Sequence, residues 1–383
     1  MNFNLTEEQE LIRKTASEIC QEEFAPRANE VDERGEFPVE NVKKLAAYDL
    51  MGIPVPAEYG GLGYDFVTWT LVGEEISKAC ATTGAIFGAN MLCLYPIMLF
   101  GSEEQKRKYL VPLAKGEKIG AFGLTEPNAG SDAGSIQTKA VKKDSSYILN
   151  GTKIFITNAG EADIYVILAK TDQERGARGM SAFIVEKGTP GFTFGKNENK
   201  MAYKALPNRE LIFENCQIPQ ENLLYKEGRG FRVAMQTLDL GRIGMGIGAV
   251  GLGQAAFHEA VKYAKTRIQF DKPISSFQAI QFMLADMATE IEAARLLILK
   301  AAFLKDQGQK FEDIAAMGKL YASEVTMRVV NKAVQIHGGY GYCKEYPVER
   351  YFREAKLFEI VEGTSEIQRG VIANYILRQK GGE

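Results

Sequence analysis

The side chains that enzymes most often use for nucleophilic or metal-assisted chemistry are scarce in this chain of 383 residues. His258 and His337 are its two histidines, and no HExxH pattern is present. No serine stands in a GxSxG sequence, which would hold it on a sharp strand-to-helix turn. Neither a metal-dependent hydrolase nor a Ser-His-Asp enzyme is therefore expected.

The cysteines offer no alternative chemistry. Their number is odd, and no CxxC pair occurs among Cys20, Cys80, Cys93, Cys216 and Cys343. Such spacing supports neither a disulfide framework nor a zinc site. The sequence predicts buried, reduced thiols and no bound metal.

Residues 246–251 (GIGAVG) match the GxGxxG pattern of dinucleotide-binding proteins. That pattern carries meaning only directly after a strand and at the start of a helix. Here it falls inside a long helical pattern, where glycines let helices approach closely. An NAD-dependent dehydrogenase therefore stays only as a rival, which a colourless protein that binds NADH would favour.

Charge and hydropathy limit the partners of the protein. The formal net charge is -3, so no basic field is available for nucleic acid or an acidic membrane. The polar, acidic start of the chain resembles neither a secretory signal nor an Arg-rich transit peptide. The longest apolar run, around residues 91–100, is too short to cross a membrane. We therefore expect a cytoplasmic protein without membrane or nucleic-acid partners.

Three zones of different periodicity predict three domains, over residues 1–118, 119–227 and 228–383. In the first zone Thr6 and Gln9 form a capping box, Pro26 ends the helix, and Ser102 caps a later one. The zones follow the order helix, strand, helix, which indicates separate domains of the α+β class and not a doubly wound sheet.

The second zone predicts short strands. Asn150-Gly151 between two β-rich runs is typical of a hairpin with a type I′ turn. Further strands are expected at 164–169, 182–186 and 210–213, which together suggest a small antiparallel barrel or sandwich. In the third zone, four amphipathic segments at 231–270, 276–307, 311–337 and 346–379 predict a four-helix bundle.

Six sequence blocks give the chain a specific resemblance. The first two are residues 123–132 (GLTEPNAGSD) and 346–369 (YPVERYFREAKLFEIVEGTSEIQR). The other four are 153–158 (KIFITN), 238–242 (LDLGR), 267–270 (RIQF) and 335–341 (QIHGGYG). In order and spacing they resemble the acyl-CoA dehydrogenase family over the whole chain, most closely its short-chain (butyryl-CoA) members. The resemblance implies an N-terminal helical domain, a middle antiparallel β-barrel domain and a C-terminal four-helix bundle.

The same resemblance implies FAD-dependent α,β-dehydrogenation of an acyl-CoA to the trans-2-enoyl-CoA, with Glu362 as the base and hydride transfer to flavin N5. The α-proton of a thioester is weakly acidic, so a carboxylate whose pKa is tuned by a dry pocket suits its removal. The thioester oxygen would be held by the amide N–H of the base and a ribityl hydroxyl, and Gly363 would let the backbone approach closely. Some relatives carry the base at the position of Gly241, which has no carboxylate here.

Further site residues are implied by the resemblance alone. The residues expected at the flavin are Phe122, Leu124, Thr125, Ser131, Phe155, Ile156, Thr157, Thr364 and Glu366. Those expected at the substrate are Tyr95, Ser131, Asp239, Arg242, Val361 and Gly363. A last group would reach the FAD of a neighbouring subunit, which implies the homotetramer usual in the family: Arg267, Gln269, Phe270, Gln335, Gly338 and Gly339.

The acyl group stays open at this point. The segment 90–96 would line its far end and holds no Lys or Arg, which argues against a dicarboxylate tail, while Leu94 and Tyr95 could close a short pocket. Three departures from the short-chain pattern leave room for a branched, alicyclic or aryl-substituted group: Val361, Asp271 and segment 202–208.

The direction of the reaction and the electron acceptor are also open. The family implies electron-transferring flavoprotein as acceptor, and the same site can reduce an enoyl-CoA. An acyl-CoA oxidase and a non-catalytic member of the fold remain as rivals.

Overall fold

A computed structural model describes residues 4–378. The first helices are α1 (Glu7–Ile19), α2 (Ala28–Arg34), α3 (Val39–Ala47), α4 (Phe66–Ala79), α5 (Ala81–Phe100), α6 (Glu103–Gln105) and α7 (Val111–Ala114). Strands follow: β1 (Gly120–Gly123), β2 (Lys139–Lys143), β3 (Ser146–Thr157), β4 (Ile164–Lys170), β5 (Met180–Glu186), β6 (Phe192–Asn197), β7 (Asn208–Pro219) and β8 (Leu223–Leu224). The last part holds α8 (Gly230–Thr266), β9 (Ile268–Gln269), β10 (Lys272–Pro273), α9 (Gln278–Asp306), α10 (Glu312–His337), α11 (Val348–Ala355) and α12 (Ser365–Arg378).

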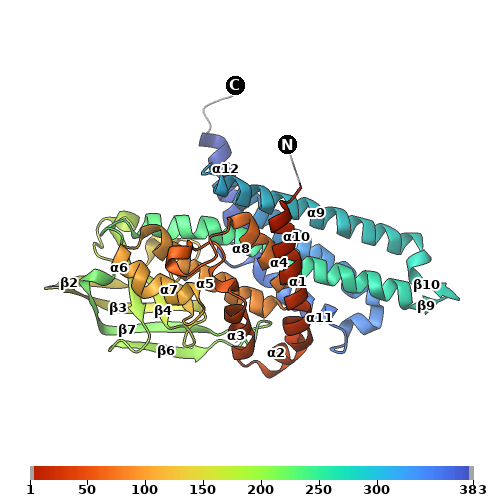
Figure 1. Cartoon of the computed structure of the whole chain (residues 1–383), viewed down its shortest axis with the longest axis horizontal. Helices are drawn as coiled ribbons and strands as arrows, with labels where there is room; N and C mark the ends of the chain where they lie inside the picture. The colour runs from red at the N-terminus through yellow and green to blue at the C-terminus, as the bar shows by residue number, and fades with distance from the viewer. Residues whose placement is uncertain (1–3, 379–383) are drawn as a thin grey trace.

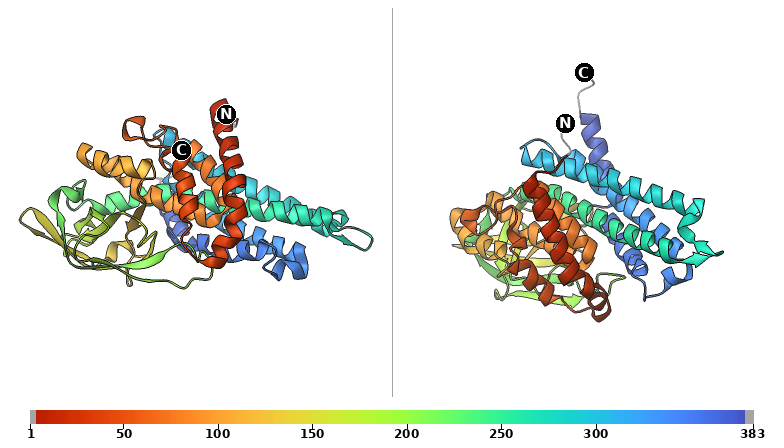
Figure 2. Two further views of the ribbon diagram at one scale, coloured as in Figure 1. Left: turned by 60° about the horizontal axis from the view of Figure 1, so that its bottom comes forward. Right: turned by 45° about the vertical axis from the view of Figure 1, so that its right-hand side comes forward.

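The long axis of the molecule separates two ends. Strands β2 to β7 gather at one end, and the β9–β10 hairpin forms the opposite tip beyond the long helices α8 and α9 (Figures 1 and 2). Helices α4 and α5 lie between, packed on α8. Helix α12 projects from the body of the molecule (Figure 1).

The helix-capping predictions are confirmed, whereas the role given to Pro26 was wrong. Thr6 and Ser102 both form capping boxes, with Gln9 and Gln105 as their partners. Helix α1 ends at Ile19 and passes into a π turn, so Pro26 stands within a following 3-10 turn. Proline is tolerated there because the first turn of a helix leaves its N–H groups unpaired anyway.

The sheet contains eight strands in the order β6-β7-β3-β2-β4-β5-β8, with β1 paired to β4. Most ladders are antiparallel, as predicted, but β1 and β2 each pair parallel with β4. The predicted hairpin at Asn150-Gly151 was wrong, because β3 runs through it to Thr157. Gly151 has a φ of 145° where the register against β7 shifts, and a Cβ there would lie 2.6 Å from the Thr138 hydroxyl oxygen. The glycine therefore permits a bulge and a close strand contact, not a turn.

The last predicted helix is divided. Three long helices, α8, α9 and α10, pack together as expected, but the segment 346–379 forms α11 and α12 with an irregular stretch between them. Gln379, its predicted end, lies outside the described residues. The interruption falls where Glu362 and Gly363 take positive φ angles.

The structure also tests the predictions for the GxGxxG segment and for the cysteines. The GxGxxG segment lies inside α8, as expected, and a Cβ at Gly246 would lie 2.1 Å from the Ile298 side chain. All five cysteines are free, but Cys343 is exposed, contrary to the prediction of buried thiols.

The apolar run of α5 is longer than the sequence analysis supposed. Helix α5, Ala81–Phe100, is one helix of 20 residues, apolar and long enough by composition to cross a membrane. Within the protein 61% of its apolar window is buried, with Cys93, Leu94 and Ile97 fully covered. This helix serves as a core element, and its length alone is weak evidence for a membrane span.

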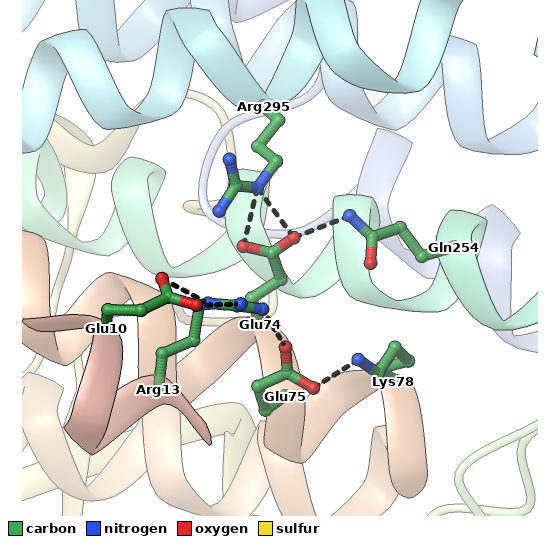
Figure 3. A network of polar contacts seen from close by, with 7 residues as sticks. All are labelled: Glu10, Arg13, Glu74, Glu75, Lys78, Gln254 and Arg295. Atoms are coloured by element: carbon green, nitrogen blue, oxygen red, sulfur yellow. Dashed lines mark hydrogen bonds and ion pairs between the residues drawn. The ribbon is translucent and has the colours of Figure 1, made fainter. Parts of the chain in front are cut away.

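A buried polar network ties the N-terminal helices to the bundle (Figure 3). Glu74 on α4 accepts hydrogen bonds from Arg295 Nε on α9 at 2.9 and 3.0 Å and from Gln254 Nε2 on α8 at 2.6 Å. Its neighbour Glu75 pairs with Lys78 and with Arg13 of α1. Because removing one partner of a buried ion pair leaves an uncompensated charge, the network fixes how α4 sits on α8 and α9.

Candidate active site

Glu362 lies in the irregular stretch between α11 and α12. Its φ is 51° and that of Gly363 is 92°, so two successive residues occupy the left-handed region. For a residue with a side chain this conformation costs roughly 1–2 kcal/mol, and such strain is found where function over-determines the backbone.

One carboxylate oxygen of Glu362, Oε2, is buried without a hydrogen-bond partner among the described residues. Burial raises the pKa of Glu362 to about 7, and the charges of Lys319 and Arg242 act in the opposite direction. A carboxylate with one buried, unpartnered oxygen and a pKa near neutrality has the properties of a general base.

A small cavity adjoins this carboxylate. Its volume is about 10 Å³, close to the minimum for one water molecule. Helices α4, α5 and α8 and the Glu362 segment supply its lining residues: Trp69, Gly88, Met91, Leu92, Leu240, Gly241, Gly244, Met245 and Glu362. The cavity is apolar apart from the carboxylate, and the Trp69 ring, stacked on Phe87 at 5.4 Å, forms one wall.

Gly241 makes room for the base. A Cβ at this position would lie 1.9 Å from Glu362 Oε2 and 2.9 Å from the Leu92 side chain. The absence of a side chain at Gly241 is therefore a steric requirement of the Glu362 position.

Asp239 and Arg242 lie one turn apart on α8 and pair with each other at 2.5 Å. Burial raises the pKa of Asp239 to about 6, against the opposing charge of Arg242. Arg242 is buried and close enough to act on the pKa of Glu362. The predicted substrate residues Asp239 and Arg242 are thus grouped with the base, whereas Ser131 is an exposed residue of the loop after β1.

Two other predicted substrate residues lie away from this cavity. Tyr95 is buried within α5, in edge contact with Phe66 at 5.6 Å, and is not among the cavity-lining residues. Val361 is half-buried beside the base and does not line the cavity either. Their predicted contacts with the acyl group stay predictions.

The predicted flavin residues come from two segments that are locked together. Glu126 accepts hydrogen bonds from Lys153 Nζ at 2.7 Å and from the amide of Thr138 at 3.0 Å. Lys153 also donates to the carbonyl of Leu124, and the Ile154 amide donates to that of Thr125 at 2.9 Å. These contacts fix the loop after β1 against β3.

Phe155 combines a strained backbone with an exposed aromatic ring. It has a φ of 58° and its side chain is 58% exposed, whereas its neighbour Ile156 in the same strand is 3% exposed. A strained backbone that presents an aromatic ring to solvent suits a flat ring system stacked on it. Thr125, Thr157 and Phe122 are half-buried nearby in the same two segments, while Leu124 and Ile156 are buried. These residues fit the isoalloxazine ring of FAD.

The remaining predicted flavin residues divide by position. Thr364 and Glu366 come shortly after the base in the sequence, and Thr364 accepts a hydrogen bond from the Ile367 amide. The others lie around the tip that carries β9 and the end of α10, far from β3 (Figure 1): Arg267, Gln269, Phe270, Gln335, Gly338 and Gly339. The structure does not bring these six together with Phe155 within one chain.

Three residues of the site were missed by sequence reasoning: Trp69, Lys319 and Gln368. Lys319 and Gln368 are buried and donate to the backbone of the Glu362 segment. The available signal for Lys319 was a lysine on an otherwise small and apolar helix face, between Ala315 and Ala322. For Trp69 the sequence offered no signal beyond its size.

The fold and site define a flavin-dependent dehydrogenase of acyl thioesters. Family profiles match residues 6–117 as "Acyl-CoA dehydrogenase, N-terminal domain", 121–216 as its "middle domain" and 228–377 as its "C-terminal domain". The chain belongs to the acyl-CoA dehydrogenase family, whose cofactor is FAD.

Individual relatives are similar over their full length. "Acyl-CoA dehydrogenase, short-chain specific" of Clostridium acetobutylicum is 53% identical, over 99% of this chain and 100% of that one. "Acryloyl-CoA reductase (NADH)" of Anaerotignum propionicum is 48% identical, over 99% and 97%.

Solved structures are similar to this chain over its full fold. Butyryl-CoA dehydrogenase of Megasphaera elsdenii superposes with a TM-score of 0.97 at 48% identity, covering 99% of this chain and 100% of that one. A chain from the structure described as "Electron transferring flavoprotein of Acidaminococcus fermentans" gives a TM-score of 0.98 at 52% identity, with the same coverage.

Proposed function

We propose that this protein oxidises short-chain acyl-CoA esters, such as butyryl-CoA, to their trans-2-enoyl-CoA products. The observation that carries the proposal is the cavity of about 10 Å³ beside Glu362, walled by Trp69, Met91 and Leu92. It is apolar and about the size of one water molecule, so its walls must move to admit any acyl chain, and a chain of few carbons requires the least movement. Its lining contains no Lys or Arg, and a dicarboxylate tail would be left unpaired there.

In this proposal Glu362 removes the α-proton. Its pKa near 7 leaves it ionised in a useful fraction at neutral pH, yet basic enough to accept the proton. The left-handed backbone at Glu362 and Gly363 turns the peptide toward the thioester, where its N–H can stabilise the developing enolate oxygen. Bound FAD supplies the hydride acceptor for the β-hydrogen.

The cofactor is oriented by the locked pair of segments. Glu126 and Lys153 hold the Thr125 loop against β3, and Phe155 covers one flavin face. Rigid placement matters because catalysis depends on the distance between the β-carbon and the flavin.

We further propose electron-transferring flavoprotein as the redox partner and a homotetramer as the working assembly. The similarity to the Acidaminococcus fermentans structure supports the first. The second is supported by exposed apolar side chains toward the ends of the helices, Phe270 at 86%, Tyr342 at 90% and Leu377 at 81% exposed. Burial of such residues against other copies would also bring the Arg267 and Gln335 group to a neighbour's FAD.

A second candidate is the reverse reaction, reduction of a 2-enoyl-CoA. The similarity to the acryloyl-CoA reductase of Anaerotignum propionicum favours it, because the same base can return a proton to the α-carbon.

An anaerobic titration distinguishes these functions. We expect butyryl-CoA to bleach the flavin absorbance of the purified holoenzyme, and added electron-transferring flavoprotein to restore it. Branched, alicyclic or aryl-substituted esters should bleach it more slowly at equal concentration. A flavin that stays oxidised with butyryl-CoA but is reduced by a bulkier ester would overturn the short-chain assignment. Rapid peroxide formation on admission of air would favour an oxidase.

A further inference from the structure

The segment that carries the base needs to be held in its unfavourable conformation. Glu362 and Gly363 both have positive φ, and regular helix resumes only at Ser365. Strain of this size persists only where neighbouring contacts over-determine the backbone. Two side chains provide such contacts.

Both side chains bind carbonyl groups of the segment. Lys319 Nζ, from α10, donates to the Gly363 carbonyl at 2.7 Å. Gln368 Nε2, from α12, donates to the same carbonyl at 3.0 Å and to that of Glu362 at 3.1 Å. Lys319 is 1% exposed and Gln368 is fully buried, so these contacts are shielded from water.

Lys319 contributes a charge as well as a contact. It takes part in no ion pair within 4.0 Å among residues 4–378, although it is an ammonium group in the protein interior. The charged groups around it are Glu362, Glu359 and Glu366, which attract it, and Arg242, which repels it. Burial lowers the pKa of Lys319 to about 8, so it is still protonated at neutral pH.

The positive charge of Lys319 lowers the pKa of Glu362 although the two side chains form no ion pair. Within residues 4–378, Glu362 Oε2 has no hydrogen-bond partner, and the charged groups acting on the carboxylate are Lys319 of α10 and Arg242 of α8. A direct ion pair would stabilise the carboxylate strongly and reduce its basicity. Lys319 is bonded instead to the Gly363 carbonyl, so it favours the ionised carboxylate more weakly and leaves Oε2 free to accept a proton.

We propose that Lys319 is a positioning residue for the base: it tethers the Gly363 carbonyl and places a positive charge beside Glu362 without bonding its carboxylate. Gln368 shares the tethering role but not the charge. The inference rests on the proposed role of Glu362 as the base.

The test separates charge from tether by three variants. In Lys319→Met both are lost, so we expect kcat to fall at least about tenfold and the midpoint of the kcat/KM–pH profile to rise by about one unit. In Gln368→Met only tethering is weakened, so kcat should fall while the midpoint stays. Lys332→Met, on the same helix but in an exposed pair with Asp286, is the matched control and should leave both unchanged.

Lys319→Gln serves if the methionine variant fails to fold, since its amide is polar but uncharged. Its pH midpoint should rise as in Lys319→Met, and Lys319→Arg should restore the midpoint toward that of the wild type. Butyryl-CoA affinity, measured on the flavin spectrum, should change little in all of them.

A pH midpoint that is unchanged in Lys319→Met or Lys319→Gln, with folded and flavin-loaded protein, would overturn the proposal, whatever happens to kcat. This failure is distinguishable from failure of the proposed function. If Glu362 were not the base, Glu362→Gln would itself keep turning over.

Discussion

Substitution of Gly241 by alanine perturbs the base without touching its chemistry. The added Cβ would lie 1.9 Å from Glu362 Oε2, and Cβ atoms are essentially never found within 3.0 Å of another heavy atom. The carboxylate must therefore retreat by at least about 1 Å, because Gly241 lies within a helix that α4, α5 and α10 hold in place. A misplacement of that size costs about 10²-fold in rate, or about 2.7 kcal/mol in activation free energy.

Stability should not follow activity in this variant. Alanine favours the helix over glycine by about 1 kcal/mol, which offsets part of the local clash. Gly73→Ala on α4 is the matched control, since its Cβ would meet Phe87 and Ile247 at ordinary distances of 3.5 and 3.6 Å. The assay is kcat/KM for butyryl-CoA together with flavin content and Tm. A folded, flavin-loaded Gly241→Ala enzyme within about threefold of wild-type kcat/KM would refute the steric reasoning.

Three further outcomes are expected. Because Glu362 must be ionised to accept a proton and its pKa is about 7, kcat/KM should rise tenfold per pH unit below 7 and level off above it; a flat profile from pH 5.5 to 8 would contradict this. Trp69→Phe should enlarge the acyl cavity and raise the hexanoyl-to-butyryl ratio of kcat/KM by about tenfold, a ratio that would stay constant if Trp69 were remote from the substrate. Lys153→Met leaves the buried Glu126 carboxylate unpaired, so unfolding free energy should drop by about 3–5 kcal/mol and FAD should dissociate more readily, as measured by denaturation and flavin fluorescence.

The sequence predicted the domain order and the long helices because both follow from periodicity and capping. Thr6 and Ser102 are local signals that the structure confirms, and α8 to α10 lie close to their predicted ranges. The predicted end at Phe270 was wrong, because α8 ends at Thr266 and the β9–β10 hairpin follows. Asn150-Gly151 misled for a physical reason: the pair suits a turn, but here Thr138 packs so closely on Gly151 that only glycine fits in a continuous strand. The residues next to Gly151 in the sequence give no sign of its contact with Thr138.

Some residues of the site could be predicted from the sequence and others could not. Glu362, Phe155 and the Thr125 loop were predicted from motifs whose resemblance to a family is specific. The roles of Lys319, Gln368 and Trp69 depend on which helices meet at the break between α11 and α12. Lys319 and Gly363, for example, are 44 positions apart in the sequence. The division of the last helix was itself unpredicted, because residues 346–379 keep a helical pattern through it.

The identity of the base is tested most directly by rapid mixing of the Glu362→Gln holoenzyme with butyryl-CoA under anaerobic conditions. Glutamine keeps the size of the side chain, so the flavin spectrum and CoA-ester binding should persist while flavin reduction slows by several orders of magnitude. Glu290→Gln on α9, whose carboxylate pairs with Arg328, is the control and should reduce at the wild-type rate. Flavin reduction in Glu362→Gln within about tenfold of the wild-type rate would contradict the account and place the base elsewhere.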